Sequence, residues 1–124
     1  MKSLSLVAAV ISAAALAGPA SAQDEAPLHK ENGMLVTASG MTVYSFDKDK
    51  RRKSACTGPC ADNWPPVQAS TAVLPLPFNT IKRPDGTLQV TYKGKPMYTF
   101  IKDKKPGDKT GDNLMQGAWH VVTN

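Results

Sequence analysis

The sequence predicts an all-β fold, a small sandwich or barrel made of two pseudo-symmetric tandem repeats. A constant shift of 54 positions carries Tyr44 and Phe46 onto Tyr98 and Phe100, and similar residues surround both pairs. The apolar runs are short and alternate with polar residues, as is typical of strands. Ten prolines and nine glycines interrupt the chain too often for helices, and we expect none after the first 22 residues. We expect a single β domain at 32–124, with repeat 1 at 32–68 and repeat 2 at 85–123.

The first 22 residues have the composition of a cleaved secretory signal peptide. Lys2 precedes an apolar run at 4–17, and the small residues at 20–22 form a cleavage site before Gln23. The apolar run, about 14 residues, is shorter than the roughly 20 that a membrane-spanning helix needs. We therefore expect export, with a flexible lead-in at 23–31 ahead of the domain.

Each repeat is predicted to begin with a β-hairpin. Strands are expected at 35–37 and 41–46 in repeat 1, and at 88–92 and 95–100 in repeat 2. Both connections contain glycine, which allows the positive φ that a tight hairpin requires. Because side chains alternate across a strand, each Tyr-x-Phe pair lies on one face, and we expect that face to meet the core.

The remainder of each repeat is predicted from its prolines and tryptophans. A final strand is expected at 118–123, and two prolines after Trp64 break its counterpart in repeat 1, because proline cannot donate to a β-ladder. Residues 71–78 are expected to form an extended linker on the core surface. Trp64 and Trp119 occupy matching positions and should be core caps. The alternative is an exposed pair that holds a sugar or a lipid tail.

Cys56 and Cys60 are the two cysteines of the chain. An exported protein folds in an oxidising compartment, where such a pair tends to form a disulfide. The intervening residues are turn formers that can bring the two sulfur atoms together. A redox or metal pair is the alternative, but thioredoxin-like motifs have two intervening residues and here there are three.

An aspartate follows each Tyr-x-Phe pair at a fixed spacing, Asp49 in repeat 1 and Asp103 in repeat 2. One hypothesis makes the tyrosine hydroxyl and the carboxylate a ligand-binding or acid–base pair. The other makes them a structural brace that accepts backbone N–H groups at the strand end. Occurrence in both repeats favours the brace, because a small domain seldom contains the same active site twice.

These residues resemble a known family. Tyr44-x-Phe46-x-x-Asp49 and its copy at 98–103 match the Tyr-x-aromatic-x-x-Asp motif of a bacterial family of predicted lipoproteins, the secreted repeat of unknown function. Residues 54–66 resemble its cysteine-containing segment, and similarity continues through 83–97 to 119–122. The resemblance implies no activity. A lipoprotein has cysteine at the cleavage site, where this chain has Gln23, so we expect a soluble periplasmic or secreted protein without a lipid anchor.

Copper is the most specific alternative ligand. Met41, Met97 and His120 offer thioether and imidazole groups, which suit copper, but no Met-x-Met or His-x-x-x-His spacing is present. Methionines in strands commonly fill the core. The acidic and amide side chains at 103–113 do not follow the alternate-position pattern of a calcium-binding loop. We therefore expect no cofactor, with copper as the alternative.

The net charge is +5, or +4 without Lys2, and residues 48–53 are the only dense basic run. Such a run is usually a solvated loop, although it can contact anionic lipid headgroups or polysaccharide. No nucleic-acid-binding motif and no catalytic motif is present. We expect a monomeric, exported, non-enzymatic binding or envelope-associated module. A periplasmic copper-binding protein is the second hypothesis and an enzyme the third.

Overall fold

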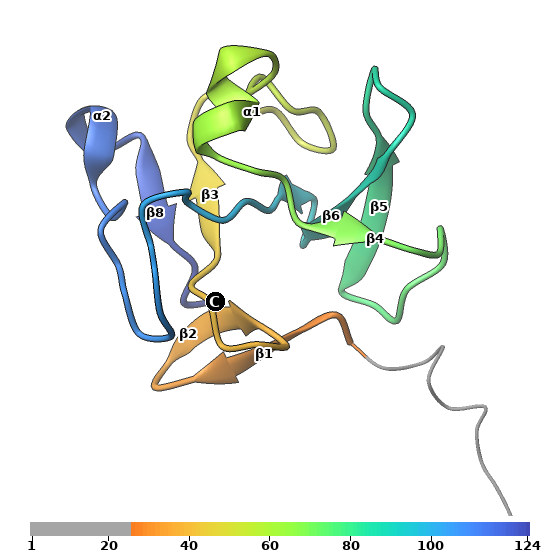
Figure 1. Ribbon diagram of the computed structural model, residues 1–124. Coiled ribbons are helices and arrows are strands. Elements are labelled where there is room, and N and C mark those ends of the chain that lie inside the picture. The colour runs from red at the N-terminus through yellow and green to blue at the C-terminus, as the bar shows by residue number, and fades with distance from the viewer. Residues whose placement is uncertain (1–25) are drawn as a thin grey trace, which may run out of the picture.

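The computed structural model describes residues 26–124 (Figure 1). The expected signal peptide at 1–22 and the first part of the lead-in lie outside these residues. The elements, in chain order, are β1 (Leu28–Glu31), β2 (Met34–Thr37), β3 (Tyr44–Phe46), α1 (Pro59–Asn63), β4 (Gln68–Ala69), β5 (Phe78–Lys82), β6 (Leu88–Tyr92), β7 (Lys95–Pro96), α2 (Leu114–Gly117) and β8 (Trp119–Val121). The strands form three small antiparallel sheets. The all-β class is confirmed, and over the described part of the chain the sheets do not close into a barrel.

The lead-in prediction is wrong for residues 28–31. These residues form β1, which pairs with β2 through a turn at Asn32 and Gly33. Both turn residues have positive φ, 52° and 81°, which a two-residue hairpin turn of this kind requires. Leu28 is 2% exposed and anchors the strand in the core. An Asn-Gly pair is the strongest short hairpin signal, and it stands in the sequence at this point.

The four-stranded sheet is built around β6, which pairs with β4, β5 and β7. The linker prediction is wrong at its end, because Phe78 begins β5 and its side chain is 6% exposed. The predicted hairpin of repeat 2 is present, with Lys93 and Gly94 in its turn. Its second strand is short, since the chain leaves β6 after Pro96 and crosses to the other repeat.

The two repeats exchange strands. The predicted hairpin of repeat 1 is present only as far as the antiparallel bridge between Val36 and Thr42. From Tyr44 on, β3 pairs with β8 of repeat 2 and not with β2. Tyr44 and Tyr98 form an antiparallel bridge, with N–O distances of 2.7 and 3.0 Å. Because these tyrosines occupy equivalent positions in the repeats, a pseudo-twofold axis passes between them. Pro66 pairs with Tyr98 as Val121 pairs with Tyr44, so the proline-broken strand still occupies its symmetric place.

Four aromatic rings stack across the junction of the repeats. The order is Phe46, Trp119, Trp64 and Phe100, with successive ring centroids 4.1, 3.7 and 4.0 Å apart. The two outer rings come from different repeats, as do the two inner rings. Trp119 is fully buried and Trp64 is 5% exposed, so the pair is internal and holds no sugar or lipid tail at the surface. A second, aliphatic cluster contains Leu35, Val43, Val90 and Met97 among others.

Helical structure is limited to two short segments. The prediction of no helix is wrong at α1, which begins at Pro59, a position where the missing N–H of proline is tolerated. α2 is not a regular helix, since Met115 and Gln116 have left-handed φ values of 55° and 60°. No helix of residues 26–124 has the length and apolar character needed to cross a bilayer.

Candidate functional site

The Tyr-x-Phe-x-x-Asp motifs of the two repeats bond to one another. The Tyr44 hydroxyl donates to Asp103 Oδ2 and the Tyr98 hydroxyl donates to Asp49 Oδ2, each at 2.7 Å. The other oxygen of Asp49 accepts the Ala55 N–H at 2.6 Å, and that of Asp103 accepts the Thr110 N–H at 2.9 Å. Each aspartate therefore closes its own loop and holds the tyrosine of the other repeat.

Both tyrosines are fully buried, which makes them unsuited to exchange protons with a ligand. Burial, together with the hydrogen bond to Asp103, holds the pKa of Tyr44 well above its ordinary value. Burial is also the main reason that the pKa of Tyr98 is raised. Neutral, hydrogen-bonded phenols of this kind act as fixed donors, so the geometry matches the brace hypothesis for both repeats.

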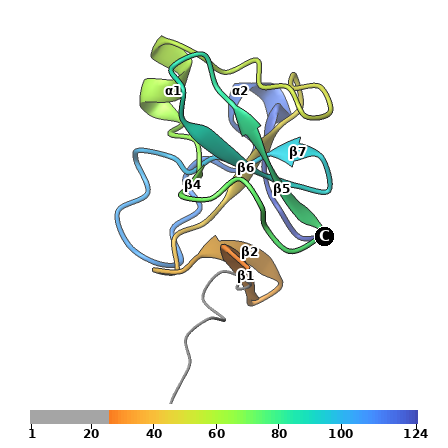
Figure 2. The ribbon, with the colours of Figure 1, turned by 90° about the vertical axis from the view of Figure 1, so that its right-hand side faces the viewer.

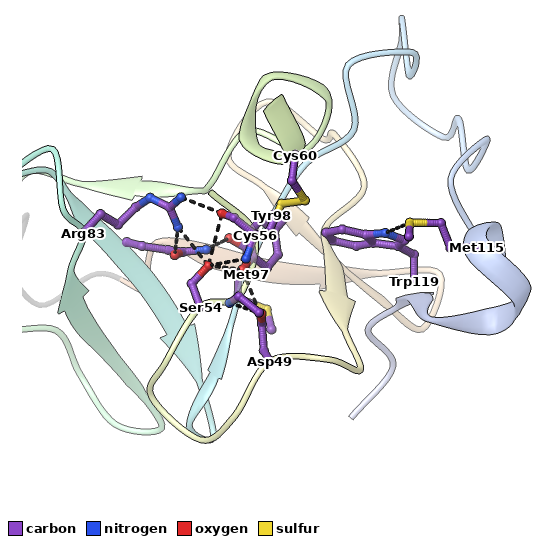
Figure 3. Close-up of a disulfide and its surroundings, with 11 residues drawn as sticks. Asp49, Ser54, Cys56, Cys60, Arg83, Met97, Tyr98, Met115 and Trp119 are labelled. Carbon is purple, nitrogen blue, oxygen red and sulfur yellow. Dashed lines mark hydrogen bonds between the residues drawn. A yellow bond between two sulfur atoms is a disulfide. The ribbon is translucent and has the colours of Figure 1, made fainter. Parts of the chain in front are cut away.

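A polar network extends from the Tyr98–Asp49 hydrogen bond (Figure 3). Ser54 Oγ shares a hydrogen bond with the Tyr98 hydroxyl and accepts from Arg83 Nη1 at 3.1 Å. Arg83 is 7% exposed and also donates to Gln89 Oε1 and to the Cys56 carbonyl, both at 2.7 Å. Its direct acceptors are neutral, so the nearby Asp49 balances its charge through the network.

The predicted disulfide between Cys56 and Cys60 is present. Cys56 is fully buried, and its carbonyl oxygen accepts the Arg83 bond described above. Cys60 lies in α1, and its carbonyl oxygen accepts the N–H of the stacked Trp64 at the end of that helix. The bond therefore fixes the loop that carries both the network and the tryptophan.

The three candidate copper ligands lie in different surroundings. Met97 is fully buried in the aliphatic cluster, and His120 Nε2 is 2.7 Å from Asp47 Oδ2. Met41 lines a groove with Thr99 and Ile101. Over residues 26–124, no group of three or more His, Cys, Asp or Glu side chains is placed to hold a metal ion.

The aspartates considered as calcium ligands accept hydrogen bonds from backbone N–H groups instead. Asp108 Oδ2 accepts the N–H groups of Lys104 and Lys105, at 2.8 and 3.1 Å. Asp112 Oδ1 accepts the Val121 N–H at 3.1 Å. The loop is therefore held together by its acids, and these are the bonds that a bound cation would have to replace.

Residues 50–53, here called the basic turn, place four consecutive cations on a tight reversal. Lys50 and Lys53 exchange two backbone hydrogen bonds of 3.0 and 2.9 Å. Arg52 has a φ of 59°, a left-handed conformation that is uncommon for a residue with a side chain. Closing this turn brings like charges together, which is unfavourable in the isolated protein. Strain and repulsion of this kind concentrate at functional sites.

The basic turn is docked on the β6–β7 turn. The Arg52 N–H donates to the Gly94 carbonyl oxygen at 2.8 Å. A Cβ atom added at Gly94 would lie 2.9 Å from Arg51 Nη1, so glycine lets the Arg51 side chain lie across the turn. Lys93, with a φ of 53°, occupies the position where asparagine is usual in such a turn. A cation stands there instead and adds to the positive surface.

Two grooves flank this junction. The first groove has a volume of about 270 Å³, and Lys50, Arg51, Lys93 and Lys95 line it. Asp47 and Asp49 line it too, but Asp47 is bonded to His120, and Asp49 to Tyr98 and Ala55. The second groove has a volume of about 290 Å³ and no acidic lining residue; it is lined by Arg51, Arg52, Leu76, Pro77, Asn79, Thr91, Lys93 and Gly94.

The basic turn, the β6–β7 turn and the beginning of β5 lie on the same side of the molecule, to the right in Figure 2. The prediction singled out residues 48–53 but not the cations at 93 and 95, which lie about 40 positions away in the chain. Only the pairing of β6 with β5 and β7 brings these segments together. Within residues 26–124, no cation of either groove forms an ion pair with a carboxylate.

Comparisons with known proteins assign a family. No curated protein and no solved structure matches the chain. The family described as a secreted repeat of unknown function matches twice, at residues 28–68 and 79–123, one match for each repeat. The second match begins within β5 and not at residue 85, in agreement with the strand that the linker prediction missed. The chain therefore belongs to the family of secreted repeats of unknown function.

Proposed function

We propose that the protein is an exported, non-enzymatic module that binds an anionic surface of the bacterial envelope through the basic turn and its two grooves. The observation that carries the proposal is a set of cations on two turns held by backbone hydrogen bonds, none of which forms an ion pair with a carboxylate of the described residues. Anionic lipids and acidic polysaccharides are the polyanions that an exported bacterial protein meets. On this proposal the mature protein is a periplasmic or secreted monomer without a lipid anchor.

The buried braces support a binding role over a catalytic one. The hydroxyls and carboxylates that could transfer protons are bonded to each other, and both tyrosines are fully buried. The cations, in contrast, lie at the surface around grooves that a ligand can enter. Such an arrangement attracts anions from a distance and holds them by charge and hydrogen bonds.

Binding to anionic surfaces tests the proposal. We expect the mature protein to sediment with phosphatidylglycerol-containing vesicles or to bind lipopolysaccharide, and to be released as salt rises. Each basic residue near an anionic membrane contributes about 1 kcal/mol, so Arg51→Ala/Arg52→Ala should weaken binding roughly thirtyfold. Lys104→Ala/Lys109→Ala removes the same charge from exposed positions in repeat 2 and serves as the matched control.

The control makes the result specific to the site. If both double variants weaken binding equally, net charge and not the basic turn is responsible. If the unmodified protein binds neither vesicles nor lipopolysaccharide at low salt, the proposed function is wrong. Circular dichroism and melting temperature should be unchanged in the control, which confirms that charge removal alone does not unfold the domain.

A further inference from the structure

The loop between β4 and β5 exposes apolar side chains beside the second groove. Val73 is 79% exposed and Leu76 is 85% exposed, the highest values for large apolar residues in the described part of the chain. Single exposed apolar residues are common and need no explanation. Here, however, Leu76 lines a groove that also holds Arg51, Arg52 and Lys93, so an apolar projection and three cations share one site.

The same loop is held firmly at both ends. Thr80 Oγ1 donates to the Ala72 carbonyl oxygen and the Lys93 N–H donates to the Pro77 carbonyl oxygen, each at 3.0 Å. Between them, Leu74 packs against the aliphatic cluster. Val73 and Leu76 are therefore presented outward by a fixed loop.

The groups around the second groove are predominantly hydrogen-bond donors. Asn79 Oδ1 accepts the Thr80 N–H at 2.9 Å, which leaves the Asn79 amide hydrogens to donate elsewhere. Arg51, Arg52 and Lys93 contribute donors only. A set of donors with no acid among them fits a phosphate group, which offers several acceptor oxygens and negative charge.

We infer that the second groove holds the headgroup phosphate of an anionic phospholipid bilayer, with Val73 and Leu76 inserted among the lipids beside it. This inference rests on the proposed function and specifies its surface. A polysaccharide would use the cations and the donors but would leave the two apolar side chains in water. A bilayer uses all three features, because its phosphates lie next to its apolar interior.

Removing the apolar groups without changing charge tests insertion. Val73→Ser/Leu76→Ser should lower the partition coefficient onto phosphatidylglycerol vesicles at least tenfold, since burying each side chain favours the bound state. Ile101→Ser/Leu114→Ser is the matched control, because these residues are also exposed, at 48% and 40%, in repeat 2. The control should bind like the unmodified protein.

Insertion can also be observed directly with Leu76→Trp. Its added fluorescence should shift to the blue on binding vesicles and should be quenched by lipids brominated on their acyl chains. The buried Trp64 and Trp119 of the unmodified protein provide the baseline. If the added indole is not quenched although the protein is bound, the side chain stays outside the bilayer and the inference is wrong.

Asn79→Asp tests the headgroup site separately. The variant keeps the shape of the side chain and the acceptor of the Thr80 N–H but replaces the amide donors with a negative charge, so we expect vesicle binding weakened severalfold. If Asn79 has only a structural role, binding will be unchanged, and that result contradicts the headgroup assignment. Inorganic phosphate at millimolar concentration should compete weakly, because it supplies the anion without the apolar contact.

Failure of this inference differs from failure of the proposed function. If Val73→Ser/Leu76→Ser binds vesicles as well as the unmodified protein while Arg51→Ala/Arg52→Ala does not, the protein binds the anionic surface but does not insert. The inference is then wrong and the proposed function stands. The same conclusion follows if lipopolysaccharide binds but phosphatidylglycerol vesicles do not. If no anionic surface binds, both proposals fail.

Discussion

The loops that follow the two braces begin alike and then differ in charge. Lys50 and Arg51 in repeat 1 correspond to Lys104 and Lys105 in repeat 2. In repeat 2, Asp108 follows and forms an ion pair of 3.1 Å with Lys105, in addition to accepting two backbone N–H groups. In repeat 1, the equivalent position is Ser54, which bonds Tyr98. Asp49 lies beside the basic turn but is bonded to Tyr98 and Ala55, and no cation of the turn forms an ion pair with a described carboxylate.

This difference distinguishes the features that build the fold from those that form the candidate binding site. The aromatic stack and the crossed Tyr–Asp bonds occur in both repeats and build the shared interior. The disulfide and the basic turn occur in repeat 1 only, and the two grooves lie where that turn meets the β6–β7 turn of repeat 2. A duplicated unit needs the same framework twice, whereas one surface is sufficient to bind a ligand. The repeats should therefore respond equally to changes in the framework and differently to changes in the loops.

The largest expected effects come from the stacked tryptophans. Trp119→Ala and Trp64→Ala should each lower the free energy of unfolding by about 3–5 kcal/mol, because each leaves a large cavity between two rings. Urea denaturation measures both. Since each indole lies inside the same stack, the two losses should be similar. A variant that loses less than half as much as the other would show that the interior is not shared equally.

The disulfide provides a test confined to repeat 1. Reduction, or Cys56→Ala/Cys60→Ala, should lower the free energy of unfolding by about 2 kcal/mol, as expected for a short closed loop. It should also loosen the Cys56 carbonyl that accepts from Arg83. Hydrogen exchange should then increase around Arg83 and α1 but not around Thr110. Equal increases in both regions would contradict the separation of the two loops.

The two brace tyrosines should differ in the cost of losing their hydroxyl. Tyr44→Phe leaves the Gly111 N–H, 3.1 Å from the hydroxyl, without its acceptor, as well as Asp103 without its donor. Tyr98→Phe leaves Asp49 Oδ2 without its donor, but the Ser54 hydroxyl can reorient to donate to it. An unpaired buried group costs about 1–3 kcal/mol, so Tyr44→Phe should be the more destabilising by about 1 kcal/mol. Thermal or urea denaturation of both variants measures the difference, and a larger loss in Tyr98→Phe would contradict it.

The sequence predicted the elements that local chemistry decides and missed those that depend on the exchange of strands. The repeat, the glycine turns and the buried aromatic pairs follow from alternation and spacing. The pairing of β3 with β8, and of Tyr44 with Tyr98, depends on which repeat supplies each partner, and no local pattern encodes that choice. β5 was missed because Pro75 and Pro77 precede it. The second groove was not predictable, since Arg52, Asn79 and Thr91 meet only after the sheet has formed.

Replacing Asp108 of repeat 2 with the serine found at the equivalent position of repeat 1 tests whether unpaired charge explains the difference between the two loops. Asp108→Ser removes the acid that pairs with Lys105 and should leave Lys104 and Lys105 uncompensated, like the basic turn. Binding to phosphatidylglycerol vesicles should then strengthen by about fivefold for the one charge gained. The converse change, Lys105→Ala, should have little effect, because that charge is already paired. If Asp108→Ser leaves vesicle binding unchanged, unpaired positive charge alone is not sufficient to create a binding surface.

The smallest expected effects are opposite pH dependences of the two loops. Burial raises the pKa of Asp49 above its ordinary value of 3.8, so the folded state binds more protons than the unfolded state, and stability falls as pH rises through the interval above 3.8. Hydrogen bonds from the Lys104 N–H and from Lys105 lower the pKa of Asp108, so its contribution is present above 3.8 and is lost as pH falls through the folded value. Urea unfolding at pH 3 to 6 measures the free energy of unfolding of the unmodified protein and of the variants Asp49→Asn and Asp108→Asn. As pH rises, the unmodified protein should lose stability relative to Asp49→Asn and gain stability relative to Asp108→Asn. Trends of the same sign would show that the two aspartates do not differ in environment as the structure indicates.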